Sequence, residues 1–316
     1  MNHILFGGWD RGIHMALEAH DVTARNGLSL NLWERSPAGD ADEAVLFVHG
    51  SITCARALFA PPVAGDDSYS WLAAPGERDR TAFALDIRGY GDSDRPPEMN
   101  EPPEENDPPV RADLAANDTA DALGFVHNRF DTVHLVGVSW GTNVCGRLIE
   151  RDDPDVASLV QCAPVYRTPY DVEDGLAALG LDSDLDAYYY QDRETVESRQ
   201  GEDADALFEA IWRTQVESNQ GVDENRYMAQ TGALADFADC CADDPPYDAA
   251  NIDVPTLVIR GSADAISRRA DATALYDELA DDAAEYAELA GADHYAMHGE
   301  RRHALYDAVN AFHDRA

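Results

Sequence analysis

The stretch Val133-His-Leu-Val-Gly-Val-Ser-Trp-Gly141, which runs into Thr142–Arg151, decides the fold. Val133–Val136 is a short apolar run typical of a buried strand, and Thr142–Arg151 has helical periodicity. The G-x-S-x-G pattern at Gly137–Gly141 therefore predicts a sharp turn between a strand and a helix. Such a turn strains the backbone of Ser139 and requires small neighbours, because strand and helix approach closely. We expect the Ser139 hydroxyl to stand exposed at the tip of this turn.

Similar apolar runs without polar alternation recur along the chain, with helical periodicity between them. They are typical of parallel strands covered by helices on both faces. The runs are Val45–Val48, Ala82–Leu85, Leu159–Val160 and Thr256–Ile259, and the helical stretches are Ala112–Phe125, Ala270–Leu279 and Arg302–Phe312. The alternation predicts an α/β fold with a doubly wound, mostly parallel sheet. Around Asn26-Gly27, the alternating stretches 22–24 and 28–33 predict an antiparallel hairpin.

One interval is too long for a connection within such a sheet. About ninety residues separate the strand near Cys162 from the next strand at Thr256, whereas such loops usually have about 2–6 residues. This interval shows helical patterns but no clear strand, at Leu176–Leu179, Ala204–Val216 and Tyr227–Cys240. We therefore expect residues 164–246 to form a helical lid inserted into a core made of residues 1–163 and 247–316.

Two further stretches have structural interpretations. The tyrosines 188–190, Phe208 and Trp212 would either line a pocket beneath the lid or pack its interior. Residues 95–110 contain six prolines among acidic residues, which excludes a helix or a central strand. We expect this stretch to be a stiff surface loop.

The charge of the chain excludes two classes of partner. Among 316 residues, 61 are acidic and 23 are basic, which gives a net charge of −38. A surface this negative repels nucleic acids and anionic membranes. All the basic residues are arginine, and 41 of the acids are aspartate. We infer a halophile's protein adapted to molar salt, where the Debye length falls to about 3 Å. A genome of high GC content would explain the missing lysine but not the size of the charge.

Cysteine usage and the start of the chain indicate a reducing compartment. Five cysteines are an odd number, and none has zinc-ligand spacing: Cys54, Cys145, Cys162, Cys240 and Cys241. Met1–Asp10 lacks the basic start and the cleavage site of a signal peptide, and no run of about 18 apolar residues occurs. We therefore expect a soluble, cytoplasmic protein, and its oligomeric state stays open.

Five motifs together resemble the α/β-hydrolase family over nearly the whole chain. They are Val48-His-Gly50, Asp86–Ser93, the turn at Ser139, Gly261–Asp264 after a late strand and Gly291–His294 near the end. The order Ser, Asp, His and the position of the lid also match this family. Within the family, the chain is most similar to the lidded serine esterase-like branch. The resemblance implies the α/β-hydrolase fold with an inserted helical lid.

The same resemblance implies a role for each of five residues. Ser139 would be the nucleophile, and His294 would be the base that takes its proton. Asp264 would hold the imidazole in the required tautomer. The backbone N–H groups of Ser51 and Trp140 would form the oxyanion hole. No cofactor and no metal enters this scheme, and the partner it implies is a small ester-like substrate.

Other residues compete with these assignments. His298 and His303 lie close enough to the predicted base to replace it, but neither has its position after a glycine that follows a strand. We expect His49 to be a structural hydrogen-bonding residue that shapes the oxyanion turn. We also expect Asp271 and Asp293 to be solvated acids that contribute little.

The predicted reaction is hydrolysis of a carboxylic ester through an acyl-enzyme. A serine at position 139 argues against the dehalogenases and epoxide hydrolases of this fold, which carry aspartate as the nucleophile. Other acyl chemistry on the same triad stays open: hydrolysis of a lactone, thioester, amide or carbon–carbon bond, or perhydrolysis. A ligand receptor that keeps the triad with little turnover is a further alternative, and turnover of a short p-nitrophenyl ester in molar salt would exclude it.

The net charge predicts that folding requires salt. Transfer from about 3 M to about 0.05 M salt lengthens the range over which the acidic side chains repel one another. The chain should then unfold and lose activity, which circular dichroism and an ester assay would both detect. An unchanged spectrum and unchanged turnover across this range would contradict adaptation to molar salt.

Overall fold

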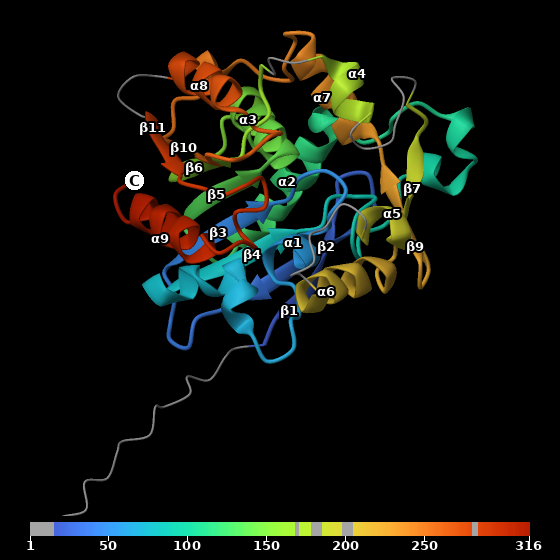
Figure 1. The fold of residues 1–316 in the computed structure, drawn as a ribbon. Helices are drawn as coiled ribbons and strands as arrows, with labels where there is room; N and C mark the ends of the chain where they lie inside the picture. Colours follow the sequence, from blue (N-terminus) through green and yellow to red (C-terminus); the bar gives the residue numbers. More distant parts are fainter. Residues whose placement is uncertain (1–15, 168–170, 178–184, 198–204, 280–283) are drawn as a thin grey trace, which may run out of the picture.

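An eight-stranded sheet forms the centre of the computed structural model, which describes residues 16–167, 171–177, 185–197, 205–279 and 284–316 (Figure 1). The strand order is β1-β2-β4-β3-β5-β6-β10-β11. From β4 to β11 neighbouring strands are parallel, whereas β1 and β2 are antiparallel. The strands are β1 (Glu18–Thr23), β2 (Ser29–Arg35), β3 (Glu43–Val48), β4 (Arg80–Leu85), β5 (Thr132–Val138), β6 (Ser158–Cys162), β10 (Thr256–Gly261) and β11 (Ala284–Leu289).

Helices cover both faces of this sheet. One face carries α2 (Ala112–His127), α3 (Trp140–Asp152) and α8 (Arg269–Glu278), and the other carries α1 (Ala55–Phe59) and α9 (Arg302–His313). A hydrophobic core lies on each face of the sheet. Successive residues of β3 point into opposite cores, with Leu46 in the core under α2 and α3 and Phe47 in the core under α9. The doubly wound, mostly parallel α/β architecture predicted from the sequence is thus confirmed.

The two ends of the sheet differ in how well the sequence predicted them. Strands β1 and β2 form the expected hairpin, and Gly27 adopts a φ of 90° in its turn. For the edge strand β11, the sequence predicted only that some strand precedes Gly291, without its bounds. Its residues are half-buried or exposed, because it lies at the edge of the sheet beside β10, and its sequence lacks an apolar run.

The chain between β6 and β10 differs from the expectation of helices alone. It contains α4 (Val172–Ala177), β7 (Tyr188–Asp192), α5 (Arg193–Glu197), α6 (Asp205–Val216), β8 (Gly221–Asp223), β9 (Arg226–Gln230) and α7 (Gly232–Cys241). Strands β7, β9 and β8 form a separate antiparallel sheet. The prediction of no strand was therefore wrong, and the pattern assigned to a helix from Tyr227 belongs to β9 as far as Gln230. Positions 178, 179 and 204 of the predicted helices lie outside the described residues, as does Met1–Asp10.

Phe208, Trp212 and Tyr227 pack in the interior of this segment, whereas Tyr190 is exposed. Phe208 and Trp212 of α6 stack on each other, and Trp212 meets Tyr227 of β9 edge to face. The proline-rich stretch 95–110 is a loop with two 3₁₀ turns, at Pro97–Asn100 and Pro103–Glu105. It packs against β7, where Met99 is buried beside Tyr188. Further 3₁₀ turns lie at Asp67–Tyr69, Trp71–Ala73, Pro75–Arg78 and Ala249–Asn251.

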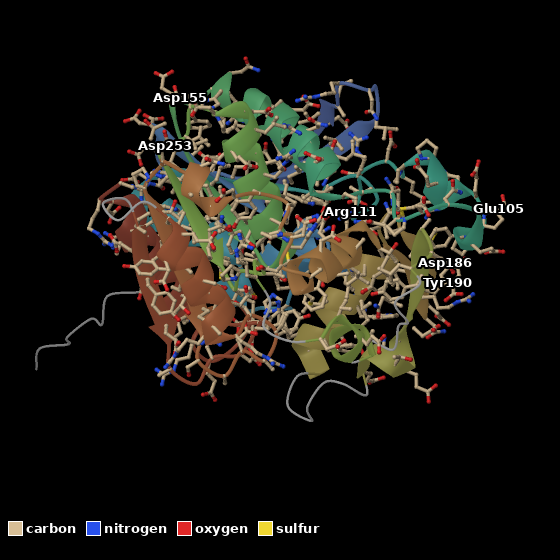
Figure 2. The ribbon with its side chains drawn as sticks, turned by 90° about the horizontal axis from the view of Figure 1, so that it is seen from above. Glu105, Arg111, Asp155, Asp186, Tyr190 and Asp253 are labelled. Atoms are coloured by element: carbon tan, nitrogen blue, oxygen red, sulfur yellow. The ribbon has the colours of Figure 1, made fainter. Side chains whose placement is uncertain are left out.

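Acidic side chains occupy the periphery of the molecule (Figure 2). Glu105, Asp155, Asp186 and Asp253 are exposed and point outward. The basic residue Arg111, which precedes α2, does not point away from the molecule in this way. Its guanidinium pairs with Asp236 and Asp239 of α7. Within the described ranges, no helix combines the length and the apolar composition needed to span a membrane.

Candidate active site

Ser139 stands at the junction of β5 and α3 with a strained backbone. Its φ is 54°, in a region that costs a non-glycine residue on the order of 1–3 kcal/mol. Hydrogen bonds on both sides hold this conformation. The Ser139 N–H donates to the Cys162 carbonyl at 2.9 Å, and the Ser139 carbonyl accepts from the Thr142 N–H at 2.9 Å. The sharp turn expected from the sequence is present.

Glycines make this turn possible because backbones approach without room for a side chain. A Cβ on Gly141 would lie 2.2 Å from the Val48 carbonyl oxygen, and one on Gly137 would lie 2.5 Å from the Gly141 carbonyl oxygen. A Cβ on Gly50 would lie 3.0 Å from the Ser139 Cβ. The contact of α3 with the end of β3 thus depends on residues that lack a side chain.

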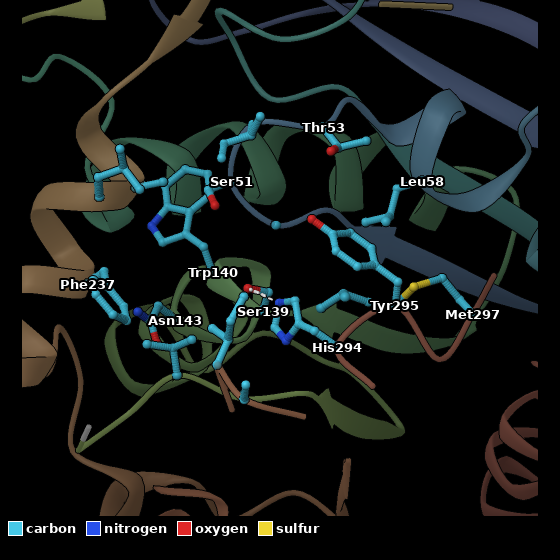
Figure 3. Close-up of a pocket in the computed structure, with 18 of the residues that line it drawn as sticks. Ser51, Thr53, Leu58, Ser139, Trp140, Asn143, Phe237, His294, Tyr295 and Met297 are labelled. Carbon is cyan, nitrogen blue, oxygen red and sulfur yellow. Dashed lines mark hydrogen bonds between the residues drawn. The ribbon is translucent and has the colours of Figure 1, made fainter. Parts of the chain in front are cut away.

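A hydrogen-bonded chain runs from Ser139 through His294 to Asp264 (Figure 3 shows the first of these bonds). His294 Nε2 lies 3.1 Å from Ser139 Oγ, and His294 Nδ1 lies 2.9 Å from Asp264 Oδ2. An ionised carboxylate can only accept, so Nδ1 carries the proton and Nε2 is left to accept from the serine hydroxyl. The structure therefore brings together the three residues predicted as nucleophile, base and acid.

Backbone groups fix the orientation of the Asp264 carboxylate. Its Oδ1 accepts from the N–H groups of Ile266 and Ser267, at 2.8 and 2.9 Å. Its side chain is fully buried, and that of His294 is 12% exposed. The imidazole thus opens toward Ser139 while its partner is shielded from water, which strengthens their hydrogen bond.

A cavity of about 350 Å³ lies over Ser139. Figure 3 shows Phe237 and Asn143 on one side of Ser139, and Tyr295, Leu58 and Met297 on the other. Most of the lining is apolar, and the insertion between β6 and β10 contributes Val165 and the α7 residues Ala233, Leu234 and Phe237. The tyrosines of β7 and the aromatics of α6 are not among its lining residues, so they do not line the pocket.

Both predicted oxyanion donors border this cavity. Trp140 is the first residue of α3, where a backbone N–H has no acceptor within the helix. Ser51 follows β3 in the loop that leads to α1. The positive end of the α3 dipole adds to the attraction of this place for a negative oxygen.

Residues 45–308 match the sequence profile described as "Alpha/beta hydrolase family". The chain belongs to the alpha/beta hydrolase family. No curated protein matches the chain by sequence.

Solved structures share the fold of this alpha/beta hydrolase at low sequence identity. An esterase from Exiguobacterium antarcticum has a TM-score of 0.65 and 15% identity, over 94% of this chain and 100% of that chain. An E-2-(acetamidomethylene)succinate hydrolase has a TM-score of 0.65 and 22% identity, over 95% and 100%. A meta-cleavage product hydrolase from Pseudomonas fluorescens has a TM-score of 0.60 and 17% identity, over 93% and 97%.

The histidines that could have competed with His294 lie elsewhere in this alpha/beta hydrolase. His298 donates from Nε2 to the Leu58 carbonyl at 2.8 Å, and burial lowers its pKa to about 4. His303 is exposed on α9. His49 is fully buried, donates from Nδ1 to the Gly50 carbonyl, and accepts from the Ile87 N–H at Nε2. The structural role expected for His49 agrees with these contacts.

The expectation of a solvated Asp271 was wrong. Asp293 is exposed, but Asp271 on α8 is fully buried. Its Oδ1 accepts from the Tyr166 N–H at 2.9 Å, and its Oδ2 has no hydrogen-bond partner among the described residues. Burial, with the nearby Asp264 carboxylate as a further cause, raises its pKa to about 7. Asp271 is buried because it lies on the side of α8 that faces the sheet, although it carries an ionisable group.

Sequence reasoning also missed Asp236 of α7. Its Oδ2 accepts from the Trp140 indole N–H and the Ala112 N–H, each at 2.7 Å, and its Oδ1 pairs with Arg111 at 2.5 Å. Asp236 therefore links the insertion to the residue that provides one predicted oxyanion donor. Nothing local marks it, because the chain is rich in aspartate and its partners are distant in sequence.

Another buried acid, Asp86, organises the loops behind the site. Its carboxylate accepts from the Ala55 N–H, the Asn31 amide and the Trp33 indole, at 2.8 to 3.0 Å. A Cβ on Gly91 would lie 2.3 Å from this carboxyl group, which explains the glycine in the stretch Asp86–Ser93. Burial raises the pKa of Asp86 to about 6. The start of α1, just beyond Ser51, is thereby tied to β2 and β4.

Asp271 predicts a change in stability with pH. Its pKa is about 7 in the folded chain against an ordinary value of 3.8, so between these values the folded state binds one proton more than the unfolded state. The free energy of unfolding from this group therefore falls as the pH rises through that window. Asp271→Asn should lose less stability than the wild type between about pH 5 and about pH 8 in denaturant titrations. Asp293→Asn, which changes an exposed acid, should follow the wild type. An equal pH dependence in all three proteins would contradict this prediction.

Proposed function

We propose that this alpha/beta hydrolase is a serine hydrolase that cleaves a carboxylic ester through an acyl-enzyme. The observation that carries the proposal is the hydrogen-bonded chain from Ser139 Oγ to His294 Nε2, and from His294 Nδ1 to Asp264 Oδ2. A serine hydroxyl becomes a useful nucleophile when a base takes its proton and a carboxylate orients that base. The apolar cavity over Ser139 suits the acyl or alcohol group of an uncharged ester.

The reaction proceeds in two halves. Ser139 Oγ attacks the ester carbonyl carbon while His294 Nε2 takes the hydroxyl proton. The carbonyl oxygen becomes negative and accepts hydrogen bonds from the N–H groups of Ser51 and Trp140. The bond to the alcohol then breaks, and the alcohol leaves with the proton from Nε2. A water molecule repeats these steps on the acyl-enzyme, which releases the acid and restores Ser139.

Other acyl substrates would use the same groups. A lactone, thioester, amide or activated carbon–carbon bond presents the same carbonyl to Ser139. We favour the ester because the sequence motifs are most similar to the serine esterase-like branch of the family, and an esterase is among the similar solved structures. A panel of these substrate classes at matched chain length ranks them directly by kcat/KM.

We also propose that residues 164–246 form the lid of this site and that the enzyme works in a halophile's cytoplasm. Three residues of α7 line the cavity, which supports the lid: Ala233, Leu234 and Phe237. The net charge of −38 supports the adaptation to salt.

Replacement of Ser139 tests the proposal most simply. Ser139→Ala should lower kcat by about 10⁶, since members of a triad act as a unit. A fluorophosphonate probe should label the wild type and should not label Ser139→Ala. Ser36→Ala, outside the cavity, should be labelled like the wild type. Persistent labelling and turnover of Ser139→Ala would exclude Ser139 as the nucleophile.

Asp264→Asn tests the acid. The amide keeps an oxygen for the N–H groups of Ile266 and Ser267, but its NH₂ then faces His294 Nδ1. The proton moves to Nε2, which can no longer accept from Ser139, and kcat should fall by about 10⁴. Steady-state kinetics should show no such loss for Asp293→Asn. Near-normal turnover of Asp264→Asn would require a different acid.

A further inference from the structure

The loop that carries Ser51 contains a strained turn. The Thr53 N–H donates to the Ser51 carbonyl at 2.8 Å, and the central residue Ile52 has a φ of 72°. A three-residue turn with a positive φ at its centre is rare, and a β-branched side chain makes it more unfavourable. Such a turn persists only where its surroundings hold it.

Hydrogen bonds from the insertion between β6 and β10 stabilise this turn. Gln215 of α6 donates from Nε2 to the Ile52 carbonyl at 2.9 Å and accepts at Oε1 from the Cys54 N–H at 3.1 Å. Gln215 is only 3% exposed. Because a carbonyl needs a donor and an N–H needs an acceptor, only this orientation of the amide satisfies both groups. One side chain of the insertion therefore bridges the far half of the turn.

A second contact from the insertion lies near Ile52, at Tyr90. The Tyr90 hydroxyl group lies near the backbone of Ile52, and Gln230 of β9 donates from Nε2 to the Tyr90 hydroxyl oxygen at 2.9 Å. The insertion thus contacts the Ile52 turn directly through Gln215 and also contacts the neighbouring Tyr90 through Gln230.

We propose that Gln215 is a positioning residue for the oxyanion hole, so that the insertion takes part in catalysis by holding Ser51 in place. This inference rests on the proposed function, because it assigns an oxyanion donor to Ser51. Donors stabilise the transition state only when they already point at the position of the developing charge. Relaxation of the Ile52 turn to a negative φ would displace the adjacent Ser51 N–H. Gln215 itself does not line the cavity.

The chain offers a matched control in Gln220. It is 2% exposed, and it also ties the insertion to the core. Its Nε2 donates to the Ser93 carbonyl at 3.1 Å, and its Oε1 accepts from Arg95 at 3.1 Å. These contacts involve residues 91–95 rather than 51–54. Loss of Gln220 should therefore cost stability like loss of Gln215 without moving Ser51.

The experiment compares Gln215→Leu, Gln215→Glu and Gln220→Leu with the wild type in molar salt. Gln215→Leu removes both hydrogen bonds at similar volume. Gln215→Glu keeps an acceptor for Cys54. Once its carboxyl group is ionised, it also sets an oxygen against the Ile52 carbonyl, so this variant is assayed at the alkaline end of the stable pH range and tests the donor even if the leucine variant folds poorly. Melting temperature, kcat and KM are measured for each protein on one p-nitrophenyl ester and on the matching thionoester.

Both Gln215 variants should lose about tenfold to a hundredfold in kcat with little change in KM, less than the roughly 10²–10³ that complete loss of one oxyanion donor costs, because the Ser51 N–H is displaced and not removed. Sulfur accepts hydrogen bonds weakly, so the thionoester depends less on these donors. The ratio of ester to thionoester turnover should therefore shrink in both Gln215 variants and stay at the wild-type value in Gln220→Leu.

Two outcomes would overturn the proposal. One is wild-type kcat in folded Gln215→Glu. The other is a loss of kcat with an unchanged ratio of ester to thionoester turnover, which would reduce Gln215 to a structural residue. Either result leaves the serine hydrolase intact, because that function is tested separately, by the turnover of Ser139→Ala and by acylation of Ser139.

Discussion

The close approach of α3 to the end of β3 is the contact on which the rest of the site depends. The Val48 carbonyl oxygen occupies the space where residue 141 would carry a Cβ, only 2.2 Å away. This contact places the first turn of α3 directly against the loop that follows β3. The nucleophile candidate Ser139, its neighbour Trp140 and the loop residue Ser51 are thereby brought to one edge of the cavity. Glycine at position 141 thus allows the Ser139 hydroxyl and the two predicted oxyanion donors to lie at the same edge of the cavity.

The insertion between β6 and β10 lines the cavity and also forms hydrogen bonds with the residues around Ser139. Its helix α7 lines the cavity through Phe237, and its buried Asp236 bonds the Trp140 indole. Its helix α6 reaches the Ser51 loop through Gln215. Buried hydrogen bonds of this kind are costly to break, since each would leave an unpaired polar group. The contacts of α6 and β9 with the core therefore favour a fixed wall over a freely opening lid in this part of the insertion.

The sequence predicted those features whose physical cause is local. The strand-turn-helix at Ser139 follows from the spacing of glycines, and the parallel strands follow from runs such as Val45–Val48 that are buried on both faces. Strands β7 and β9 were missed because they pair only within a small sheet of the insertion. The buried segment Tyr227–Gln230 shows no alternation of apolar and polar faces.

Residues held by contacts between distant parts of the chain could not be predicted from the sequence. Gln215 meets Cys54 and Ile52 across 161 and 163 residues of sequence, and nothing near Gln215 in the chain indicates these partners. Asp271 resembles the many surface aspartates by sequence, but its helix turns it toward the core. The three residues predicted as a triad stood out in the sequence because a motif after a strand marks each of them. A buried acid or amide elsewhere in the chain has no such mark.

The central claim is that Ser139 forms a covalent acyl intermediate. Its most direct test is mass spectrometry of the wild-type protein, mixed with a slowly hydrolysed ester and quenched with acid during turnover. The account predicts a protein heavier by one acyl group, with the group on the peptide that contains Ser139, and loss of this adduct as the substrate is consumed. Steady turnover without an acylated Ser139, or an acyl group on another residue, would contradict it.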